Sequence, residues 1–147
     1  MKFITQILKL KTRKELDFIN ISNKILVIFK KLKIKNGFIN IYSKHTTLAI
    51  IINEYEKFLL KDMRIFMEKL TSEKMYFHDN IKLRKDCSPD EPENARGHLR
   101  CMLMEAFQTI PIINYKLQLG KYQQVIVIET SGPRTREIII QILGEEK

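Results

Sequence analysis

The stretch of the chain that decides the fold is GFINIYSKHTTLAIIINE, residues 37–54. Residues 37–42 and residues 46–52 are rich in β-branched and aromatic side chains, which fit the pleated, half-buried surface of a strand. We therefore predict two strands here, with His45 at or near the junction between them. The pattern thus places His45 at the end of a sheet.

The same kind of signal marks both ends of the chain. Residues 1–10 alternate between polar and apolar side chains, and residues 16–21 form a second short run. On the C-terminal side, turn signals such as Leu119-Gly120 separate further apolar runs. These runs predict strands at residues 110–113, 125–129 and 137–143.

Three helices are predicted between the strands. Ser22 is the predicted N-cap of the first, whose apolar residues recur at i, i+3, i+4 and i+7 and which ends near residues 36–37. Apolar stripes predict a second helix over residues 59–70 and a third over residues 92–107. Residues 71–93 lack a sustained period and are predicted to be mainly loop, and a loop that long is often functional.

The chain has 147 residues, which is enough for one domain with a buried core. No repeat or Gly/Ser linker divides it, so we predict a single α+β domain over residues 1–147. No run approaches the roughly 18 apolar residues of a membrane span, and the first residues do not form a signal peptide. We expect a cytoplasmic protein with no membrane partner, in which Cys87 and Cys101 are free thiols.

Positive charge is concentrated in the first third of the chain. Residues 1–44 carry the whole surplus behind the formal net charge of +9, with eleven Lys or Arg against only Glu15 and Asp17. Such a segment could attract nucleic acid or a phosphorylated ligand. The alternative, which the scattering of the lysines among apolar residues favours, is an ordinary solvated surface.

Histidine is scarce, and His45, His78 and His98 are the only three. Imidazole ligates metals readily and titrates near neutral pH, so these residues bound where such chemistry can occur. If they converge, they could hold a catalytic metal and leave a position open for water or substrate. Separate structural or surface roles are the alternative, and the wide spacing does not decide between the two.

Polar residues beside the predicted strands and helices are further candidates. Asn53 and Glu54 end the second strand and could serve the same site, although Asn53 could also cap a helix. Asn94, one turn before the third histidine, has the same ambiguity. Asp62 could orient a ligating imidazole or be an ordinary helix-surface acid. Glu129 ends a strand, where it could act in a site or be a solvated strand terminus.

Arg134 and Arg136 point the same way if the chain is extended there, which gives a surface of two guanidinium groups suited to phosphate or carboxylate. A strand edge protected by charge is the alternative. The chain has no Walker-type phosphate loop, dinucleotide-binding glycine motif, Cys-x-x-Cys pair or nucleophilic-serine elbow, which removes several common classes of enzyme.

A series of motifs along nearly the whole chain resembles the YjbQ-like family, also described as the secondary thiamine-phosphate synthase enzyme family. The matching landmarks are Gly37, His45-Thr46-Thr47, Ile52-Asn53-Glu54, Asp62, His78, Asn94, His98-Leu99, Ile110-Pro111, Leu117, Leu119-Gly120, Gln123, Glu129, Gly132-Pro133-Arg134 and Arg136. Each motif alone is weak, and their order and spacing carry the resemblance.

The resemblance implies a β-sandwich-like α+β subunit with mostly antiparallel sheets, commonly assembled as a homotrimer. It also implies a histidine-lined pocket that can hold a divalent metal such as zinc. Family members are linked to thiamine phosphate synthase activity, which joins a pyrimidine diphosphate to a thiazole phosphate.

Three hypotheses about function follow. The first is a metal-assisted enzyme acting on a small phosphorylated substrate. Its metal ligands would be His45, His78 and His98, its catalytic residues Glu54, Asp62 and Glu129, and its substrate-binding residues Asn53, Asn94, Arg134 and Arg136. The second is a nucleic-acid-binding module that uses the basic N-terminal segment, with strongly salt-dependent binding. The third is a ligand-binding or assembly protein whose pocket does no chemistry.

Overall fold

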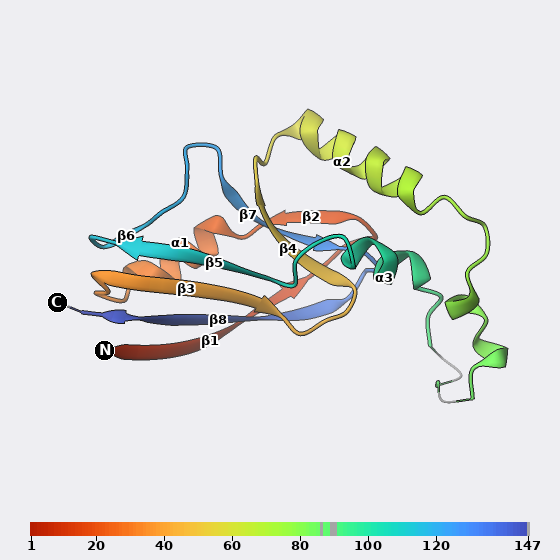
Figure 1. Ribbon diagram of the computed structural model, residues 1–147, viewed down its shortest axis with the longest axis horizontal. Helices are drawn as coiled ribbons and strands as arrows, with labels where there is room; N and C mark the ends of the chain where they lie inside the picture. Colours follow the sequence, from red (N-terminus) through yellow and green to blue (C-terminus); the bar gives the residue numbers. More distant parts are fainter. Residues whose placement is uncertain (86, 89–90, 147) are drawn as a thin grey trace.

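Two antiparallel sheets and three helices make up the part of the chain that the computed structural model describes, residues 1–85, 87–88 and 91–146 (Figure 1). The five-stranded sheet contains, from edge to edge, β1 (Lys2–Lys11), β8 (Thr135–Glu145), β3 (Asn36–Ser43), β5 (Phe107–Ile113) and β6 (Lys116–Leu117). The three-stranded sheet contains β2 (Asp17–Asn20), β7 (Gln124–Glu129) and β4 (Leu48–Asn53). The helices are α1 (Ser22–Lys30), α2 (Lys57–Leu70) and α3 (Ala95–Cys101), and the short 3-10 turns η1 (Phe77–Asp79) and η2 (Ile81–Leu83) precede α3. The predicted α+β, β-sandwich-like fold is confirmed.

The main core lies between the two sheets. Side chains alternate along β8, so that Ile138, Ile140 and Ile142 are buried while their neighbours face outward. Ile39 and Ile41 of β3 pair with β8 and point into the same core, and α1 closes one end of it. Because a shift of one residue would turn the buried isoleucines outward, this alternation sets the register of the sheet.

A smaller core lies on the other side of the three-stranded sheet, under α2. β7 is the central strand of that sheet, and all but its first residue are buried, because its alternate side chains belong to the two cores. Met63 and Met67 of α2 pack against the cluster that contains Phe18, Ala49 and Ile128. The predicted second helix is thus present, and it covers the sheet from outside (Figure 1).

Residues 37–54 form two strands as predicted, but the strands belong to different sheets. β3 pairs with β8 and β5, whereas β4 pairs with β7. Residues 44–47 therefore carry the chain from one sheet to the other, and His45 lies in this crossing segment. The other predicted strands are also present, as β1, β2, β5, β7 and β8.

The predicted C-terminal end of the first helix is wrong. α1 ends at Lys30 and not near residues 36–37. Ile34 is completely buried in the main core, and the Lys35 N–H donates a hydrogen bond to Glu145 O of β8 (2.7 Å). These tertiary interactions keep the segment out of the helix, although its residue types are compatible with one.

Ser22 is not the N-cap that its residue type predicts. It is the first helical residue, and Ile21 occupies the cap position. The Ser22 hydroxyl oxygen instead accepts a hydrogen bond from the Val125 N–H of β7 (2.8 Å). The serine side chain therefore links α1 to β7 and does not cap the helix.

The third helix is shorter than predicted. It spans Ala95–Cys101 instead of residues 92–107. The Ala106 carbonyl accepts a hydrogen bond from the Ser43 N–H at the end of β3 (2.8 Å). Because this pairing extends the five-stranded sheet, the backbone opens after α3 and β5 begins directly afterwards.

The long predicted loop over residues 71–93 is mainly irregular, and its described residues include the two 3-10 turns. Residues 86, 89 and 90 of that predicted loop lie outside the described residues. Cys87 and Cys101 are both free. None of the helices in the described segments combines the length and the apolar character needed to cross a bilayer.

Candidate functional site

The crossing segment that carries His45 is held by hydrogen bonds on both sides. Ser43 Oγ accepts from the His45 N–H (3.2 Å), and Thr130 donates to Thr47 O through its N–H (3.0 Å) and its hydroxyl (2.7 Å). His45 Nε2 accepts from the Glu137 N–H of β8 (3.1 Å). This contact fixes the ring at the sheet end. Because Nε2 accepts, the neutral ring carries its proton on Nδ1, which remains to donate a hydrogen bond to a ligand.

His78 and His98 meet at α3. Their ring centroids lie 4.9 Å apart in an edge-on arrangement, and His78 Nε2 lies 3.0 Å from Asn94 Oδ1. The Asn94 side chain therefore does not cap α3. The Ala95 N–H donates to Asp79 Oδ1 instead (2.9 Å), so the residue after His78 anchors the helix that carries His98.

Gly97 lets α3 lie against the turn that follows β7. A Cβ at this position would lie 3.0 Å from Ser131 Cβ and 3.1 Å from Thr130 O, closer than side chains normally pack. The Thr130 hydroxyl also donates to Gly97 O (3.0 Å). The glycine, which costs a helix about 1 kcal/mol relative to alanine, thus brings His98 toward the segment that carries the two arginines.

Arg136 and Glu129 form a buried, bidentate ion pair. Nε and Nη2 of Arg136 donate to the two carboxylate oxygens, each at 2.6 Å, and the side chains are 6% and 0% exposed. Thr12 Oγ1 and the Ser131 N–H donate to the same carboxylate, and Nη2 also donates to Thr47 Oγ1 (2.9 Å). Glu129 is therefore not a solvated strand terminus, and both of its oxygens serve to position Arg136.

One cavity of about 310 Å³, here called the histidine cavity, brings together five of the predicted site residues. Its lining residues are Lys44, His45, Thr46, Thr47, Glu91, Pro92, Asn94, His98, Arg134 and Arg136. Arg134 is exposed and Arg136 is buried, so the two predicted arginines reach the same space from different depths. A more apolar hollow of about 260 Å³ also has His45 and His98 in its lining.

The two histidines of this cavity favour the neutral form. Burial is the main cause that lowers the pKa of His45 below 6.5, and the positive charges of Arg136 and Lys44 add to it. Burial also lowers the pKa of His98, and His78 adds to the effect. Both imidazoles therefore favour the neutral form at neutral pH. Among the described residues no hydrogen bond occupies a ring nitrogen of His98, which can accept a proton or ligate a metal, whereas the acceptor nitrogen of His45 is already used by the Glu137 N–H.

The three histidines approach one another without forming a closed metal site. Among the residues with described positions, no group of three or more His, Cys, Asp or Glu side chains is arranged to hold a metal ion. His78 and His98 are in contact, whereas His45 lies on a separate segment and reaches only the cavity that His98 shares. The chain on its own thus offers an adjacent pair of imidazoles and a third nearby.

Asn53, Glu54 and Asp62 do not line the histidine cavity. β4 begins beside Glu129 and ends at Asn53, so Asn53 and Glu54 lie at the opposite end of the strand from the histidines. Both are exposed, and Asn53 Oδ1 accepts a hydrogen bond from the Glu54 N–H (2.8 Å). Asp62 is exposed on α2. Within one chain, these three predicted residues are not brought together with the others.

Several residues of the site were missed by reasoning from the sequence. Thr47 belongs to the His-Thr-Thr motif, and its pairing with a buried arginine could have been sought there. Asp79 directly follows His78, a position from which it could have been considered as a cap. Thr12 carried no local signal, because its partner Glu129 is 117 residues away.

The two packed sheets and the histidine cavity define a small α+β protein with a cationic, histidine-lined site where the chain crosses between its sheets. The chain belongs to the family described as UPF0047 protein YjbQ-like, whose model matches residues 6–145. The resemblance noted in the sequence is thereby confirmed at the level of the family.

Relatives of this family match almost the whole chain. A UPF0047 protein of Methanothermobacter thermautotrophicus is 34% identical over 146 residues, which cover 99% of this chain and 95% of the relative. One from Archaeoglobus fulgidus is 35% identical, covering 92% of this chain and 98% of the relative. Among solved structures, a YbjQ-like protein of unknown function from Sulfolobus solfataricus P2 has a TM-score of 0.86 and 29% identity, with 98% of this chain and 99% of that one covered.

Proposed function

We propose that the protein is an enzyme that binds a small phosphorylated substrate in the histidine cavity. The observation that supports this most is the set of cations in the lining, Lys44, Arg134 and Arg136. Lys44 and Arg136 also pair with Glu137 and Glu129, whereas Arg134 forms no ion pair within the described residues. Arg136 is already held by its ion pair and presents a guanidinium group in a fixed orientation. A phosphate can therefore bind without ordering this side chain, which is how preorganised sites gain affinity and rate.

His98 supplies the acid–base chemistry of the proposal, and His45 supplies a hydrogen-bond donor. His98 and His45 reach the same cavity as the arginines, and both have a lowered pKa. The neutral His98 imidazole can take a proton from a nucleophile while the cations bind the negative charge of the phosphate, and His45 Nδ1–H can donate a hydrogen bond to the substrate. Asn94, which also lines the cavity, would hold the substrate or orient His78.

The proposal also includes a divalent metal such as zinc, held by two of the three histidines. His78 and His98 are the adjacent pair that would supply two nitrogen ligands, with oxygen atoms of substrate or water at the other positions. Bound there, the ion would act as a Lewis acid on the phosphate. With the ion bound, His98 would act as a ligand and not as the proton acceptor, whereas the role of the arginines would not change. Metal analysis of the purified protein and of a His98→Ala variant tests this part, and an unchanged metal content in the variant would refute it.

The finer proposal is a secondary thiamine phosphate synthase activity, which rests on the family resemblance. In that reaction a pyrimidine diphosphate joins a thiazole phosphate and pyrophosphate leaves. The cavity would supply Arg134, Arg136 and Lys44 to stabilise the departing pyrophosphate.

Turnover of the two thiamine precursors by the purified protein, and rescue of a thiamine-requiring strain, test this proposal together. We expect His98→Ala to abolish both, and Arg134→Gln to reduce turnover roughly tenfold. Arg96→Gln is the matched control, because Arg96 is also exposed but does not line the histidine cavity. Equal effects of the two arginine variants would refute the assignment, and binding without turnover would favour a non-catalytic ligand-binding protein.

One groove supports nucleic-acid binding as a second candidate. The loop before β2 brings basic residues of the N-terminal segment beside basic residues of α2, around the exposed Tyr55. The groove is lined by Arg13, Lys14, Asp17, Phe18, Tyr55, Lys57, Leu60, Lys61 and Arg64. Cations next to an aromatic ring suit a single strand. Retention on single-stranded DNA at low salt, weakened by Lys61→Gln but not by Lys69→Gln outside the groove, would support it, and no retention would exclude it.

The homotrimer implied by the resemblance is supported by the outer face of the five-stranded sheet. Two apolar rows cross this face at paired positions, and a polar row lies between them. The apolar rows are Phe3, Leu143, Phe38 and Pro111, and Ile7, Ile139, Tyr42 and Phe107. Phe3 is 63% and Ile7 57% exposed, and apolar faces of this kind mark interaction sites.

Light scattering after size-exclusion chromatography tests the assembly. We expect three times the chain mass of 17.5 kDa, and a shift to one chain in Phe38→Lys, because the lysine would be buried unpaired. Val27→Lys, on the exposed side of α1, is the control. A monomeric wild-type protein would contradict the proposal.

A further inference from the structure

A second cavity lies at the other end of the molecule, between α1 and the segment around β6. It encloses about 450 Å³, a size usual for small-molecule sites, and shares no lining residue with the histidine cavity. In Figure 1, α1 and β6 lie toward one end and α3 toward the other. The lining residues are Ser22, Asn23, Leu26, Phe29, Lys30, Tyr115, Lys116, Leu117, Leu119, Gly120, Gln123 and Gln124.

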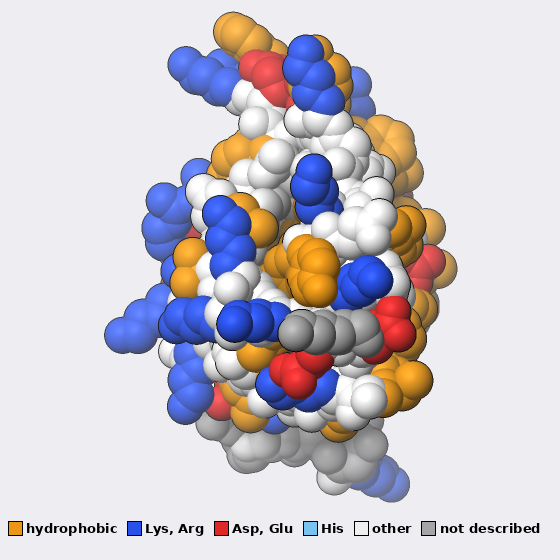
Figure 2. Space-filling view, turned by 90° about the vertical axis from the view of Figure 1, so that its left-hand side faces the viewer, with side chains coloured by type: hydrophobic (Ala, Val, Ile, Leu, Met, Phe, Trp, Pro, Cys, Tyr) orange, Lys and Arg blue, Asp and Glu red, His pale blue; other side chains and the backbone are white. Residues whose placement is uncertain are grey.

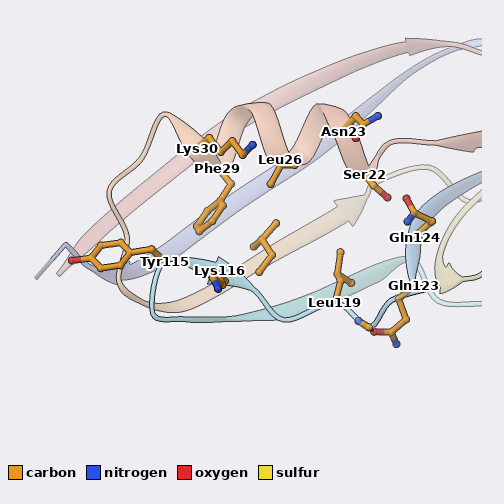
Figure 3. Close-up of a pocket in the computed structure, with 12 residues that line it drawn as sticks. Ser22, Asn23, Leu26, Phe29, Lys30, Tyr115, Lys116, Leu119, Gln123 and Gln124 are labelled. Atoms are coloured by element: carbon orange, nitrogen blue, oxygen red, sulfur yellow. The ribbon is translucent and has the colours of Figure 1, made fainter.

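The floor of this cavity is apolar. Leu26 and Phe29 lie on α1, one turn apart, and Figure 3 shows them directed at the wall from which Leu119 points back. Leu117 completes the floor, and both leucines of this wall are partly buried against the main core. Apolar surface gains about 25 cal/mol for each Å² removed from water, so the floor favours a ligand with an apolar body.

Two polar groups of the rim use an acceptor atom in contacts within the protein. Ser22 Oγ accepts from the Val125 N–H (2.8 Å), and Gln124 Oε1 accepts from Asn20 Nδ2 (3.1 Å). The Ser22 hydroxyl hydrogen and Gln124 Nε2 have no acceptor among the residues that the structure describes. Both groups therefore remain as donors, and a donor-rich rim selects a ligand that accepts hydrogen bonds.

The charge of the rim agrees with these donors. Lys30 on α1 and Lys116 on β6 stand on opposite sides of the cavity, and no acidic residue belongs to its lining. Neither lysine forms an ion pair with an acid in the described residues. Figure 2, which looks at this end of the molecule, shows many Lys and Arg side chains on this face, with apolar side chains and fewer Asp or Glu side chains among them. An anion placed here would meet two cations that no carboxylate has neutralised.

We propose that this cavity binds a small amphipathic anion, a molecule with an apolar chain or ring and one carboxylate or phosphate head group. The apolar body lies between Phe29 and Leu119, and the head group accepts hydrogen bonds at the rim between Lys30 and Lys116. This site is independent of the function proposed for the histidine cavity, because the two share no residue.

Calorimetric titration of the full chain with octanoate, octyl phosphate and octan-1-ol tests the proposal. We expect one of the two anions to bind at least tenfold more tightly than the alcohol, and the tighter anion identifies the head group. Lys30→Gln and Lys116→Gln should each weaken anion binding roughly twofold to fivefold. Equal affinity for the anions and the alcohol, or no binding of either anion, would overturn the proposal.

Two matched controls separate the cavity from general surface charge and surface hydrophobicity. Lys121→Gln removes a lysine of the neighbouring loop that is not in the lining, and should leave binding unchanged. Leu26→Asp places a negative charge in the floor and should abolish anion binding, whereas Val27→Asp changes the next residue, which is 57% exposed and outside the cavity. A loss of binding in Lys121→Gln as large as in Lys30→Gln, or in Val27→Asp as large as in Leu26→Asp, would refute the site.

Discussion

The two ends of the paired strands β4 and β7 have opposite characters. At one end, Leu48 pairs with Glu129, whose carboxylate is buried and bound to Arg136. At the other end, Asn53 pairs with Gln124, and the Asn53 side chain is exposed. Both ends carry a polar residue directly after an apolar run, yet only the first belongs to the histidine cavity.

The difference teaches that a strand end becomes a site when other segments converge on it. The first end receives the crossing segment with His45, the helix with His98 and the turn with Arg134. The second end leads into α2, and the polar side chains of Asn20, Ser22 and Gln124 near it form hydrogen bonds beside α1 without histidine or arginine. Interlocked contacts, and not the residue type at the strand end, distinguish the two.

Breaking the buried ion pair should have the largest effect. In Glu129→Gln the guanidinium group of Arg136 stays buried without its counter-charge, and we expect a loss of about 3–5 kcal/mol in the free energy of unfolding. Urea denaturation measures it. Asn53→Ala at the opposite end is the control and should change stability by less than about 0.5 kcal/mol. Similar losses in the two variants would contradict the claim that the two strand ends differ.

A smaller loss is expected from the hydroxyl group that holds the outer part of Arg136. Thr47 Oγ1 accepts a hydrogen bond from Arg136 Nη2 (2.9 Å), so Thr47→Val should cost about 1–2 kcal/mol in urea denaturation. Thr46→Val changes the same residue type in the same segment, but Thr46 is exposed. A cost in Thr46→Val as large as in Thr47→Val would show that the segment, not the hydrogen bond, is responsible.

These contacts also show how far the sequence could predict the structure. The strands of residues 37–54 were predictable because β-branched runs report burial in a sheet directly. That the two strands belong to different sheets was not, because nothing local distinguishes a crossing segment from a hairpin turn. α3 stops early for a similar reason, since the Ser43 N–H that pairs with Ala106 O comes from a distant strand.

For the site, residue chemistry predicted the members of the cavity better than their roles. His45, His98, Asn94 and the two arginines line one space. Glu129 was a catalytic candidate, and the structure shows its carboxylate fully occupied in holding Arg136. Its partner Thr12 is recognisable only once β1 and β8 have paired, because 117 residues separate the two.

The free energy of unfolding should also depend on pH through the histidines at the first strand end, and this effect should be smaller than those of the substitutions above. His45 and His98 have a pKa below the unfolded value of 6.5, so the unfolded chain binds more protons once the pH falls below that value. Stability is then fully present above pH 6.5 and is lost as the pH falls toward the folded pKa. Urea denaturation as a function of pH should show a shallower acid loss in His98→Gln, and an unchanged slope would contradict the burial of this ring.

The smallest effect is expected at the exposed strand end. Glu54→Gln removes a charge that lies outside the histidine cavity, so both the free energy of unfolding and the affinity for pyrophosphate should stay within error of the wild-type values. Denaturation and calorimetry measure the two quantities. A clear loss of pyrophosphate affinity in a trimeric sample, but not in a monomeric Phe38→Lys variant, would mean that Glu54 serves the cavity of a neighbouring subunit.

The most direct test of the central claim uses the three histidines themselves. Their ring C–H signals can be followed by NMR during titration with pyrophosphate and assigned with single His→Gln variants. The account predicts that the signals of His45 and His98 move together and that their pKa rises when the anion binds beside them. Pyrophosphate binding that leaves both signals in place, or no binding at all, would contradict the claim that these residues and the arginines form one site.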